Sequence, residues 1–311
     1  MVQQGNWLSF HLFVLGGSLS SMLNKLLLPL SERIRTYSPD CFFFIRYWEN
    51  GPHFRLRIKI QDSEKGHQIR EMIEAFVAEL NEQTEREIVP QPIIRVEAVP
   101  YIPETQRYGG ARGLQIAETH FEVSSLLTLS IAQQYELGEY SFAMSIALQA
   151  HLVFLQHSGL LRNDIHNLLQ SILNGWLPYA IKALVQTDQI EAGANPQQTR
   201  INCLNYFDAA FAKNGEQTIS FLQSLFTLLQ NQSLDPAHPL FRWQSDNDTL
   251  LAKLSTLATE NKLDGPSDSA KHNHLSILSS LMHMTNNRLG ISNSDESYLA
   301  YLLIQFYTSI V

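Results

Sequence analysis

Cysteine is scarce in this sequence, and long apolar runs are absent from it. The two cysteines, Cys41 and Cys203, lie far apart and neither belongs to a CxxC pair. This excludes zinc ribbons, iron–sulfur ligation and a disulfide framework, and it is typical of a reducing cytoplasm. No apolar run reaches the roughly 18 residues of a membrane-spanning helix, and the N-terminus lacks the basic segment of a signal peptide. We therefore expect a cytoplasmic protein without a membrane span.

Charge is also sparse, and the balance is acidic. Charged residues make up 17% of the 311 residues, and Lys+Arg 22 against Asp+Glu 30 gives a formal net charge of −8. We therefore expect no direct binding of nucleic acid across the surface, although a local basic pocket is compatible with this balance. Hydrophobic residues make up 44%, enough for a sizeable core in one large or two smaller domains.

The first third of the chain alternates strand-like and helix-like patterns. Aromatic and β-branched residues predict strands, and apolar residues at helical spacing predict helices. The strands are expected over 7–15, 41–48, 53–60 and 93–102, and the helices over 22–30 and 63–80. Asn50-Gly51 is typical of a hairpin turn between the second and third strands. The order β-α-β-β-α-β predicts a ferredoxin-like sheet.

Helical patterns replace the strands from about residue 114. They cover 118–134, 140–158, 162–183, 199–214, 218–230, 250–260, 275–288 and 296–310. We therefore expect an α+β fold, with an N-terminal ferredoxin-like βαββαβ module over 1–113 and a mostly helical module over 114–311. No flexible linker separates the modules, so we expect them to form one integrated domain.

The third predicted strand carries several cations. Because side chains alternate along a strand, His53, Arg55, Arg57 and Lys59 share one face. Arg46 on the neighbouring strand is expected to add to the same side. An exposed basic face is one interpretation. An anion site is the other, because closely set arginines repel one another unless an anion or a carboxylate lies among them.

Two further segments carry polar side chains that are candidate site residues. After the fourth strand, Glu104 and Arg107 lie three residues apart in a tight, glycine-rich connection, which is either a structural turn with a local ion pair or part of a carboxylate site. On the helix over 275–288, His283 and Asn287 are neighbours on one polar face. An ordinary surface histidine is the alternative for His283.

Familiar catalytic and metal-binding motifs are missing. The sequence contains no HExxH, P-loop, GxSxG or protein-kinase motif. His272 and His274 have no carboxylate or cysteine at ligand spacing. We therefore expect no metal site.

Three segments, RYWENGPHFRLRI, YIPETQRYGG and HMTNNRLG, occur in this order. Together they resemble the C-terminal elimination domain of class I lantibiotic dehydratases, also called the thiopeptide-type bacteriocin biosynthesis domain, from about Asn6 to the chain end. In that family a separate large domain first esterifies a serine or threonine of a precursor peptide with glutamate from glutamyl-tRNA. The elimination domain then expels the glutamate and leaves dehydroalanine or dehydrobutyrine. The chain lacks the large domain and therefore resembles a stand-alone elimination subunit, a lyase.

The resemblance implies a set of site residues. It implies catalytic roles for Arg55, Arg57 and His283 and substrate binding by Glu104 and Arg107; we add Arg46 and Asn287 as further substrate-binding candidates. Elimination requires that the α-proton is removed, the enolate-like charge is stabilised and the glutamate is held as it leaves. Guanidinium groups and a histidine suit these tasks, and no metal or redox cofactor is required. We expect these groups to surround one pocket between the two modules.

The resemblance also leaves two alternatives open. Stand-alone members of the superfamily include enzymes that join two dehydroalanines by a formal [4+2] cycloaddition into a pyridine, and that branch does not need the glutamate-handling groups. A non-catalytic peptide-binding subunit of a modification complex is the third hypothesis. The implied partners are a ribosomal precursor peptide and a separate tRNA-dependent glutamylating enzyme, and the sequence leaves a homodimer open.

Overall fold

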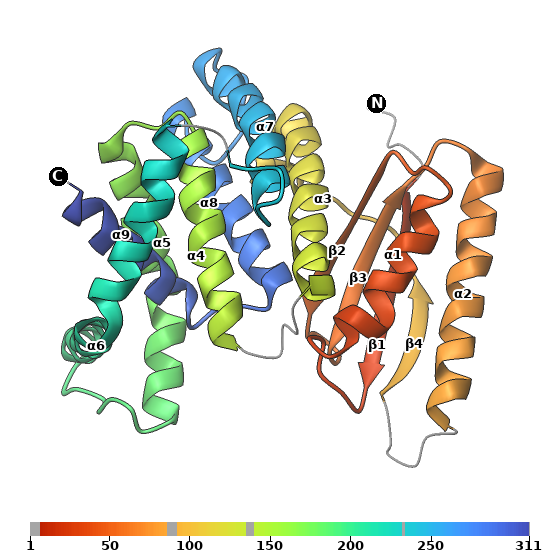
Figure 1. The fold of residues 1–311 in the computed structure, drawn as a ribbon, viewed down its shortest axis with the longest axis horizontal. Coiled ribbons are helices and arrows are strands. Elements are labelled where there is room, and N and C mark those ends of the chain that lie inside the picture. Colours follow the sequence, from red (N-terminus) through yellow and green to blue (C-terminus); the bar gives the residue numbers. More distant parts are fainter. Residues whose placement is uncertain (1–6, 86–91, 135–139, 232–233, 311) are drawn as a thin grey trace. The chain divides into compact units, whose positions relative to one another are not determined.

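The computed structural model describes residues 7–85, 92–134, 140–231 and 234–310. Contacts divide the chain into two compact units, Met1–Glu139 and Tyr140–Val311. All the described strands belong to the first unit (Figure 1).

The first unit contains a four-stranded antiparallel sheet. Its strands are β1 (Trp7–Leu15), β2 (Cys41–Tyr47), β3 (His53–Lys59) and β4 (Ile93–Ala98), in the order β2-β3-β1-β4. η1 (Leu23–Leu27) and α1 (Leu28–Arg35) connect β1 to β2, and α2 (Ser63–Glu85) leads from β3 towards β4. This order and these connections confirm the predicted α+β class and the ferredoxin-like sheet.

One face of this sheet forms the apolar core. The register places Phe10, Leu56 and Phe44 side by side on three strands, and all three side chains are fully buried. Helices α1 and α2 cover this face: Figure 1 shows α1 in front of the sheet and α2 beside β4, and the Arg70 guanidinium of α2 lies 5.4 Å from the Phe10 ring. Burial of each such side chain stabilises the fold by roughly 1.5–3 kcal/mol.

Helix α3 (Gly110–Gln134) follows the short helix η2 (Thr105–Tyr108) and packs along the edge strand β2. Side chains of α3 accept hydrogen bonds from the outer backbone of β2: Phe42 N donates to Glu122 Oε1 over 3.2 Å, and Phe44 N donates to Ser125 Oγ over 3.2 Å. The edge strand is thereby protected from pairing with another chain. Because α3 packs on the sheet in this way, the division at Glu139 lies after this helix, whereas the expected boundary at residue 113 lies inside it.

The second unit is helical. It contains α4 (Tyr140–His157), α5 (Arg162–Gln186), α6 (Pro196–Asn231), α7 (Phe241–Thr259), α8 (Ala270–Leu289) and α9 (Glu296–Ser309). Helix α4 contacts α6, α7, α8 and α9, and Ala147, Ala150 and Leu152 on it are fully buried. A helix that is apolar on most sides belongs at the centre of such a bundle. No described helix is long and apolar enough to cross a membrane.

The helical pattern of the sequence differs from the structure in one long element. Two helices are predicted over 199–214 and 218–230, but the structure has a single helix α6 of 36 residues. A Cβ atom at Gly215 would lie only 2.5 Å from the Phe211 ring, and that ring packs edge-on against Tyr301. Gly215 therefore makes room for an aromatic side chain and does not interrupt the helix. Helices α7 and α8 also begin earlier than predicted, at Phe241 and Ala270.

Candidate active site

The second face of the sheet carries the β3 cations. Arg57 lies opposite Phe43 of β2 and Ser9 of β1, while Arg55 lies opposite Ile45 and His11. Strand alternation therefore brings both arginines to the side of the sheet away from the apolar core, as predicted. Arg57 is only 6% exposed, and the side chain of Arg55 is 26% exposed. We call Arg55, Arg57, His11 and His53 the arginine cluster.

Arg57 is a buried cation whose described partners are all uncharged. Its Nη1 donates to the carbonyl oxygens of Leu56 and Phe10 over 3.0 and 3.4 Å, and its Cζ lies 5.5 Å from the centre of the Tyr101 ring. Its buried Nε donates no hydrogen bond. Burial, with a smaller contribution from Arg55, lowers the pKa of Arg57 to about 10, so the group is still charged at neutral pH. An anion placed here would gain charge-assisted hydrogen bonds from a donor that is already desolvated.

Arg55 is held by neighbours on the same face. Its Cζ lies 3.3 Å from the centre of the Tyr47 ring, a cation–π contact, and its Nε donates to Nε2 of His53 over 3.4 Å. Nδ1 of His53 lies 2.9 Å from the carbonyl oxygen of Gly51, so His53 carries its proton on Nδ1 and accepts at Nε2. The only described ion pair of Arg55 is with Glu49 at 3.7 Å, and that carboxylate is 68% exposed.

His11 joins the arginine cluster, although the sequence assigns it no role. Its ring centre lies 4.7 Å from that of His53. Burial lowers the pKa of His11 most, and the charges of Arg57, His53 and Arg55 contribute in that order of size, so that the pKa is about 4. His11 is therefore neutral at neutral pH and adds no charge to the cluster. The sequence does not show that His11 shares a face with Arg55, because this depends on the pairing of β1 with β3.

The prediction that Arg46 adds its charge to this side is wrong. Arg46 pairs with Phe54 in the β2–β3 register, so its side chain is on the apolar-core face. There it is 2% exposed, and Nη1 donates to Ser20 Oγ over 2.8 Å. The sequence shows alternation within a strand but not the register between strands, and a shift by one residue reverses the face.

The connection after β4 contains the predicted local ion pair. Nη1 of Arg107 donates to Oε2 of Glu104 over 2.9 Å, and both side chains are partly exposed. Gly109 and Gly110 both have positive φ values, 83° and 77°, which lets the chain turn sharply into α3. Tyr101, at the start of this connection, reaches the arginine cluster with its ring and donates its hydroxyl proton to Glu118. The roles of Glu104 and Arg107 toward a substrate stay predictions.

His283 in the second unit has a carboxylate partner. Its Nδ1 lies 2.7 Å from Oε1 of Glu296, whose side chain is 1% exposed. The Trp176 ring of α5 stacks on the imidazole, with centres 4.6 Å apart and planes at 23°. The sequence predicts Asn287, one helical turn away, as the orienting neighbour, but the structure places Glu296 of α9 at Nδ1. The convergence of His283 with the arginine cluster stays a prediction.

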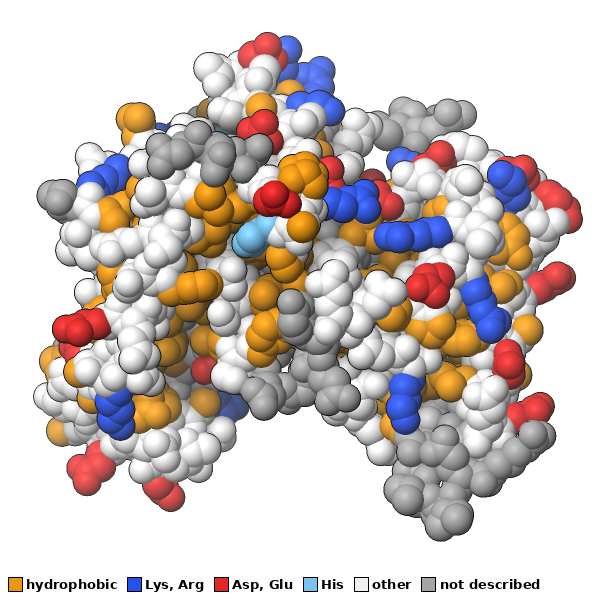
Figure 2. Space-filling model, viewed as in Figure 1, with side chains coloured by type: hydrophobic (Ala, Val, Ile, Leu, Met, Phe, Trp, Pro, Cys, Tyr) orange, Lys and Arg blue, Asp and Glu red, His pale blue; other side chains and the backbone are white. Residues whose placement is uncertain are grey.

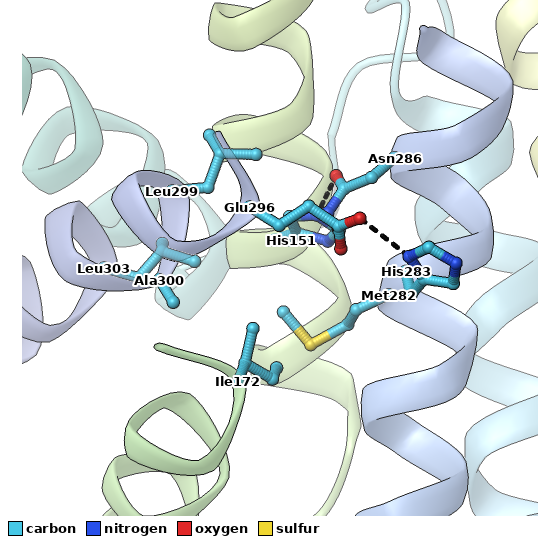
Figure 3. Close-up of a pocket in the computed structure, with 9 residues that line it drawn as sticks. All are labelled: His151, Ile172, Met282, His283, Asn286, Glu296, Leu299, Ala300 and Leu303. Carbon is cyan, nitrogen blue, oxygen red and sulfur yellow. Dashed lines mark hydrogen bonds and ion pairs between the residues drawn. The ribbon is translucent and has the colours of Figure 1, made fainter. Parts of the chain in front are cut away.

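Glu296 belongs to a small pocket within the second unit (Figure 3). Its lining residues are His151, Ile172, Met282, His283, Asn286, Glu296, Leu299, Ala300 and Leu303. We call the four hydrogen-bonded polar members, His151, Asn286, Glu296 and His283, the histidine relay. The sequence contains no local signal for it, because its members come from three helices and lie up to 145 positions apart.

The charge pattern of the surface is mixed. Among the described residues on the face shown in Figure 2, acidic and basic side chains are interspersed and form no single basic patch. Within the described ranges, no group of three His, Cys, Asp or Glu side chains is placed to hold a metal ion.

Comparisons with known proteins agree with the fold and the motifs. The family model "Lantibiotic biosynthesis dehydratase C-term" matches residues 7–307. The epidermin biosynthesis protein EpiB of Staphylococcus epidermidis is 23% identical over 152 residues, which are 49% of this chain and 15% of EpiB.

Several solved structures share the fold. The tRNA-dependent lantibiotic dehydratase MibB from Microbispora sp. 107891 has a TM-score of 0.68 at 18% identity, with 100% of this chain and 29% of MibB covered. TbtD, a pyridine synthase from thiomuracin biosynthesis, has a TM-score of 0.66 at 14% identity, with 98% of both chains covered. The chain thus spans less than a third of EpiB and MibB, and nearly all of TbtD. The match over residues 7–307 shows that the chain belongs to the lantibiotic dehydratase C-terminal family.

Proposed function

We propose that the chain catalyses β-elimination of glutamate from glutamylated serine or threonine residues of a ribosomal precursor peptide. The products are glutamate and dehydroalanine or dehydrobutyrine. A separate tRNA-dependent enzyme supplies the glutamyl ester, and the precursor peptide is the substrate of both enzymes.

The observation that carries this proposal is the arginine cluster. Arg57 is desolvated and charged, and it has a donor without a partner, while Arg55 lies on the same sheet face. Two guanidinium groups of this kind suit an acyloxy leaving group, which becomes a carboxylate as the Cβ–O bond breaks. Fixed donors in a dry site stabilise such developing charge without reorganisation. Arg107 and Glu104 are the proposed groups that recognise the remainder of the glutamate.

His283 supplies the proton chemistry in this proposal. Imidazole exchanges protons near neutral pH, and this one is fixed between a carboxylate and an indole ring. Removal of the α-proton is the difficult part of the elimination, and a positioned base contributes roughly 10²–10⁴-fold to such a step.

The pyridine-forming cycloaddition is the second candidate, and one observation favours it. The pyridine synthase TbtD shares the fold over 98% of this chain, with a TM-score of 0.66. Groups that suit the binding of glutamate and the transfer of a proton favour elimination, because joining two dehydroalanines releases no glutamate. These groups are Arg55, Arg57, Glu104, Arg107 and His283.

Two substrates offered in parallel test the proposal. One is a precursor peptide that carries a glutamyl ester, and the other is the same peptide with two preformed dehydroalanines. Mass spectrometry should show loss of glutamic acid from the first peptide and no change in the second. Reaction of the second peptide alone would support cycloaddition, and binding without any reaction would support a peptide-binding subunit.

A further inference from the structure

The histidine relay is one continuous line of hydrogen bonds within the second unit (Figure 3). Nε2 of His151 lies 2.7 Å from Oδ1 of Asn286, and Nδ2 of Asn286 donates to Oε2 of Glu296 over 3.1 Å. Oε1 of Glu296 lies 2.7 Å from Nδ1 of His283. Three of the four members are at most 3% exposed, and only His283 is accessible at the end of the line.

The direction of the hydrogen bonds follows from the chemistry of the groups. A carboxylate only accepts, so Asn286 must present its NH₂ to Glu296 and its carbonyl oxygen to His151. His151 therefore carries a proton on Nε2. Burial lowers the pKa of His151 to about 4, so the ring is neutral and its Nδ1 is unprotonated. Nδ1 of His151 has no hydrogen-bond partner, and this direction therefore avoids a buried, unpaired N–H.

The same logic fixes the other end of the relay. Nδ1 of His283 must be the protonated nitrogen, because it faces a carboxylate oxygen that can only accept. The lone pair of neutral His283 is then on Nε2. Trp176 stacks on the ring and restricts its rotation about the side-chain bonds.

We propose that Glu296 is a positioning residue that holds His283 as the Nδ1–H tautomer and makes Nε2 the atom that takes the proton. Asn286 and His151 fix the carboxylate of Glu296 in turn. This proposal rests on the proposed elimination. In that step Nε2 takes the α-proton, the C–H electron pair becomes the Cα=Cβ bond, and the Cβ–O bond breaks. Glutamate leaves as a carboxylate with the electron pair of the Cβ–O bond, and Glu296 stabilises the imidazolium that forms.

The second unit contains a matched control pair. Nδ1 of His157 lies 3.1 Å from Oδ1 of Asp248, and Nε2 of Gln244 lies 3.2 Å from Nε2 of His157. This is the same histidine–carboxylate chemistry, but Asp248 is 69% exposed, whereas Glu296 is 1% exposed. Asp248→Asn therefore tests whether loss of any histidine-bound carboxylate affects the reaction.

The tautomer itself is the first test and needs no substrate. Two-bond ¹H–¹⁵N spectra of the full chain, labelled at histidine and assigned with His283→Gln, should show a protonated Nδ1 and a bare Nε2 for His283. In Glu296→Gln the amide NH₂ competes for Nδ1, and the spectrum should shift toward the Nε2–H form. An Nε2–H tautomer in the unsubstituted protein would overturn the proposal, whatever the variants do.

Single-turnover elimination on a pre-glutamylated peptide is the second test. Glu296→Gln should slow it roughly 10–100-fold, in the range seen when a partner that orients an imidazole is lost; Glu296→Asp should recover part of the rate, and Asp248→Asn should keep all of it. A full rate in Glu296→Gln would refute the positioning role while elimination itself stands. Absence of elimination in the unsubstituted protein, with the Nδ1–H tautomer present, would instead refute the proposed function.

Discussion

The arginine cluster and the histidine relay differ in the hydrogen-bond partners of their buried polar groups. Arg57 is buried and charged, but its described partners are carbonyl oxygens and a ring. In the relay, by contrast, hydrogen bonds connect His151, Asn286, Glu296 and His283 in sequence. A buried cation without a counterion is costly, whereas a connected polar network is not.

This difference suits the two features to different proposed tasks: the arginine cluster to binding an anion, and the histidine relay to positioning an imidazole. The arginine cluster gains its missing partner when an anion arrives, so it suits a leaving group that becomes negatively charged. The members of the relay are hydrogen-bonded to one another, which suits the proposed role of holding one imidazole in a fixed orientation. Substitutions that remove or preserve each feature therefore test the comparison directly.

The largest effect is expected at His283. His283→Ala or His283→Phe should slow elimination roughly 10²–10⁴-fold, because the group that takes the proton is lost. Affinity for the glutamylated peptide should change little. Single-turnover rates on pre-glutamylated peptide, which avoid the tRNA-dependent step, measure this effect, and an unimpaired rate would remove His283 from the mechanism.

The next largest effect is expected at Arg57. Arg57→Ala removes a charged donor that contributes on the order of 2–4 kcal/mol to a transition state, so elimination should slow by about 30- to 10³-fold and glutamylated peptide should accumulate in the coupled reaction. Arg57→Lys should restore little, because an ammonium lacks the bidentate fork. Arg107→Ala should also cause glutamylated peptide to accumulate.

Arg95 provides the matched control for Arg57. It lies on the same sheet face through its pairing with Phe13, but it is 54% exposed and forms an ion pair with Glu97 at 2.9 Å. Arg95→Ala should leave the elimination rate within about threefold of the unsubstituted rate, as expected for an exposed pair. Equal losses of elimination rate in Arg57→Ala and Arg95→Ala would show that the burial of Arg57 does not set it apart from an exposed arginine on the same sheet face.

A moderate effect on stability is expected from His151. Its pKa is lowered to about 4 by burial, while that of an unfolded histidine is about 6.5. The unfolded chain therefore binds more protons between these values, and the free energy of unfolding should fall as the pH falls from 6.5 to 4, by up to about 3 kcal/mol from this residue. Denaturant titrations at several pH values should show a shallower dependence in His151→Gln, and an identical dependence would contradict the assignment.

The smallest effect is expected at Arg46. It lies on the apolar-core face, opposite the arginine cluster. Arg46→Met should therefore leave the elimination rate within about threefold, and replacement of a buried ionic group by an apolar side chain of similar volume is often neutral or stabilising. A specific loss of elimination in a folded Arg46→Met variant would place its charge back in the site.

Part of this arrangement could be predicted from the sequence. Strand alternation was sufficient to bring Arg55 and Arg57 to one face, and helical spacing was sufficient to place His283 away from the apolar stripe of α8. Arg46 was assigned to the wrong face because its orientation depends on the register between two strands, which the sequence does not show. Glu296 was missed as a partner because the contact joins two helices and leaves no repeated spacing. The predicted break between residues 214 and 218 is wrong because the fit of the Phe211 ring beside Gly215 is a property of packing, which the sequence pattern does not show.

The most direct measurement of the central claim is single-turnover release of glutamate from a pre-glutamylated peptide by the unsubstituted chain, Arg57→Ala and His283→Ala. Glutamate elimination predicts rapid release with formation of dehydroalanine by the unsubstituted chain, and an intact ester with peptide still bound in both variants. An ester left intact by the unsubstituted chain, together with cyclisation of a peptide that carries two dehydroalanines, would contradict it.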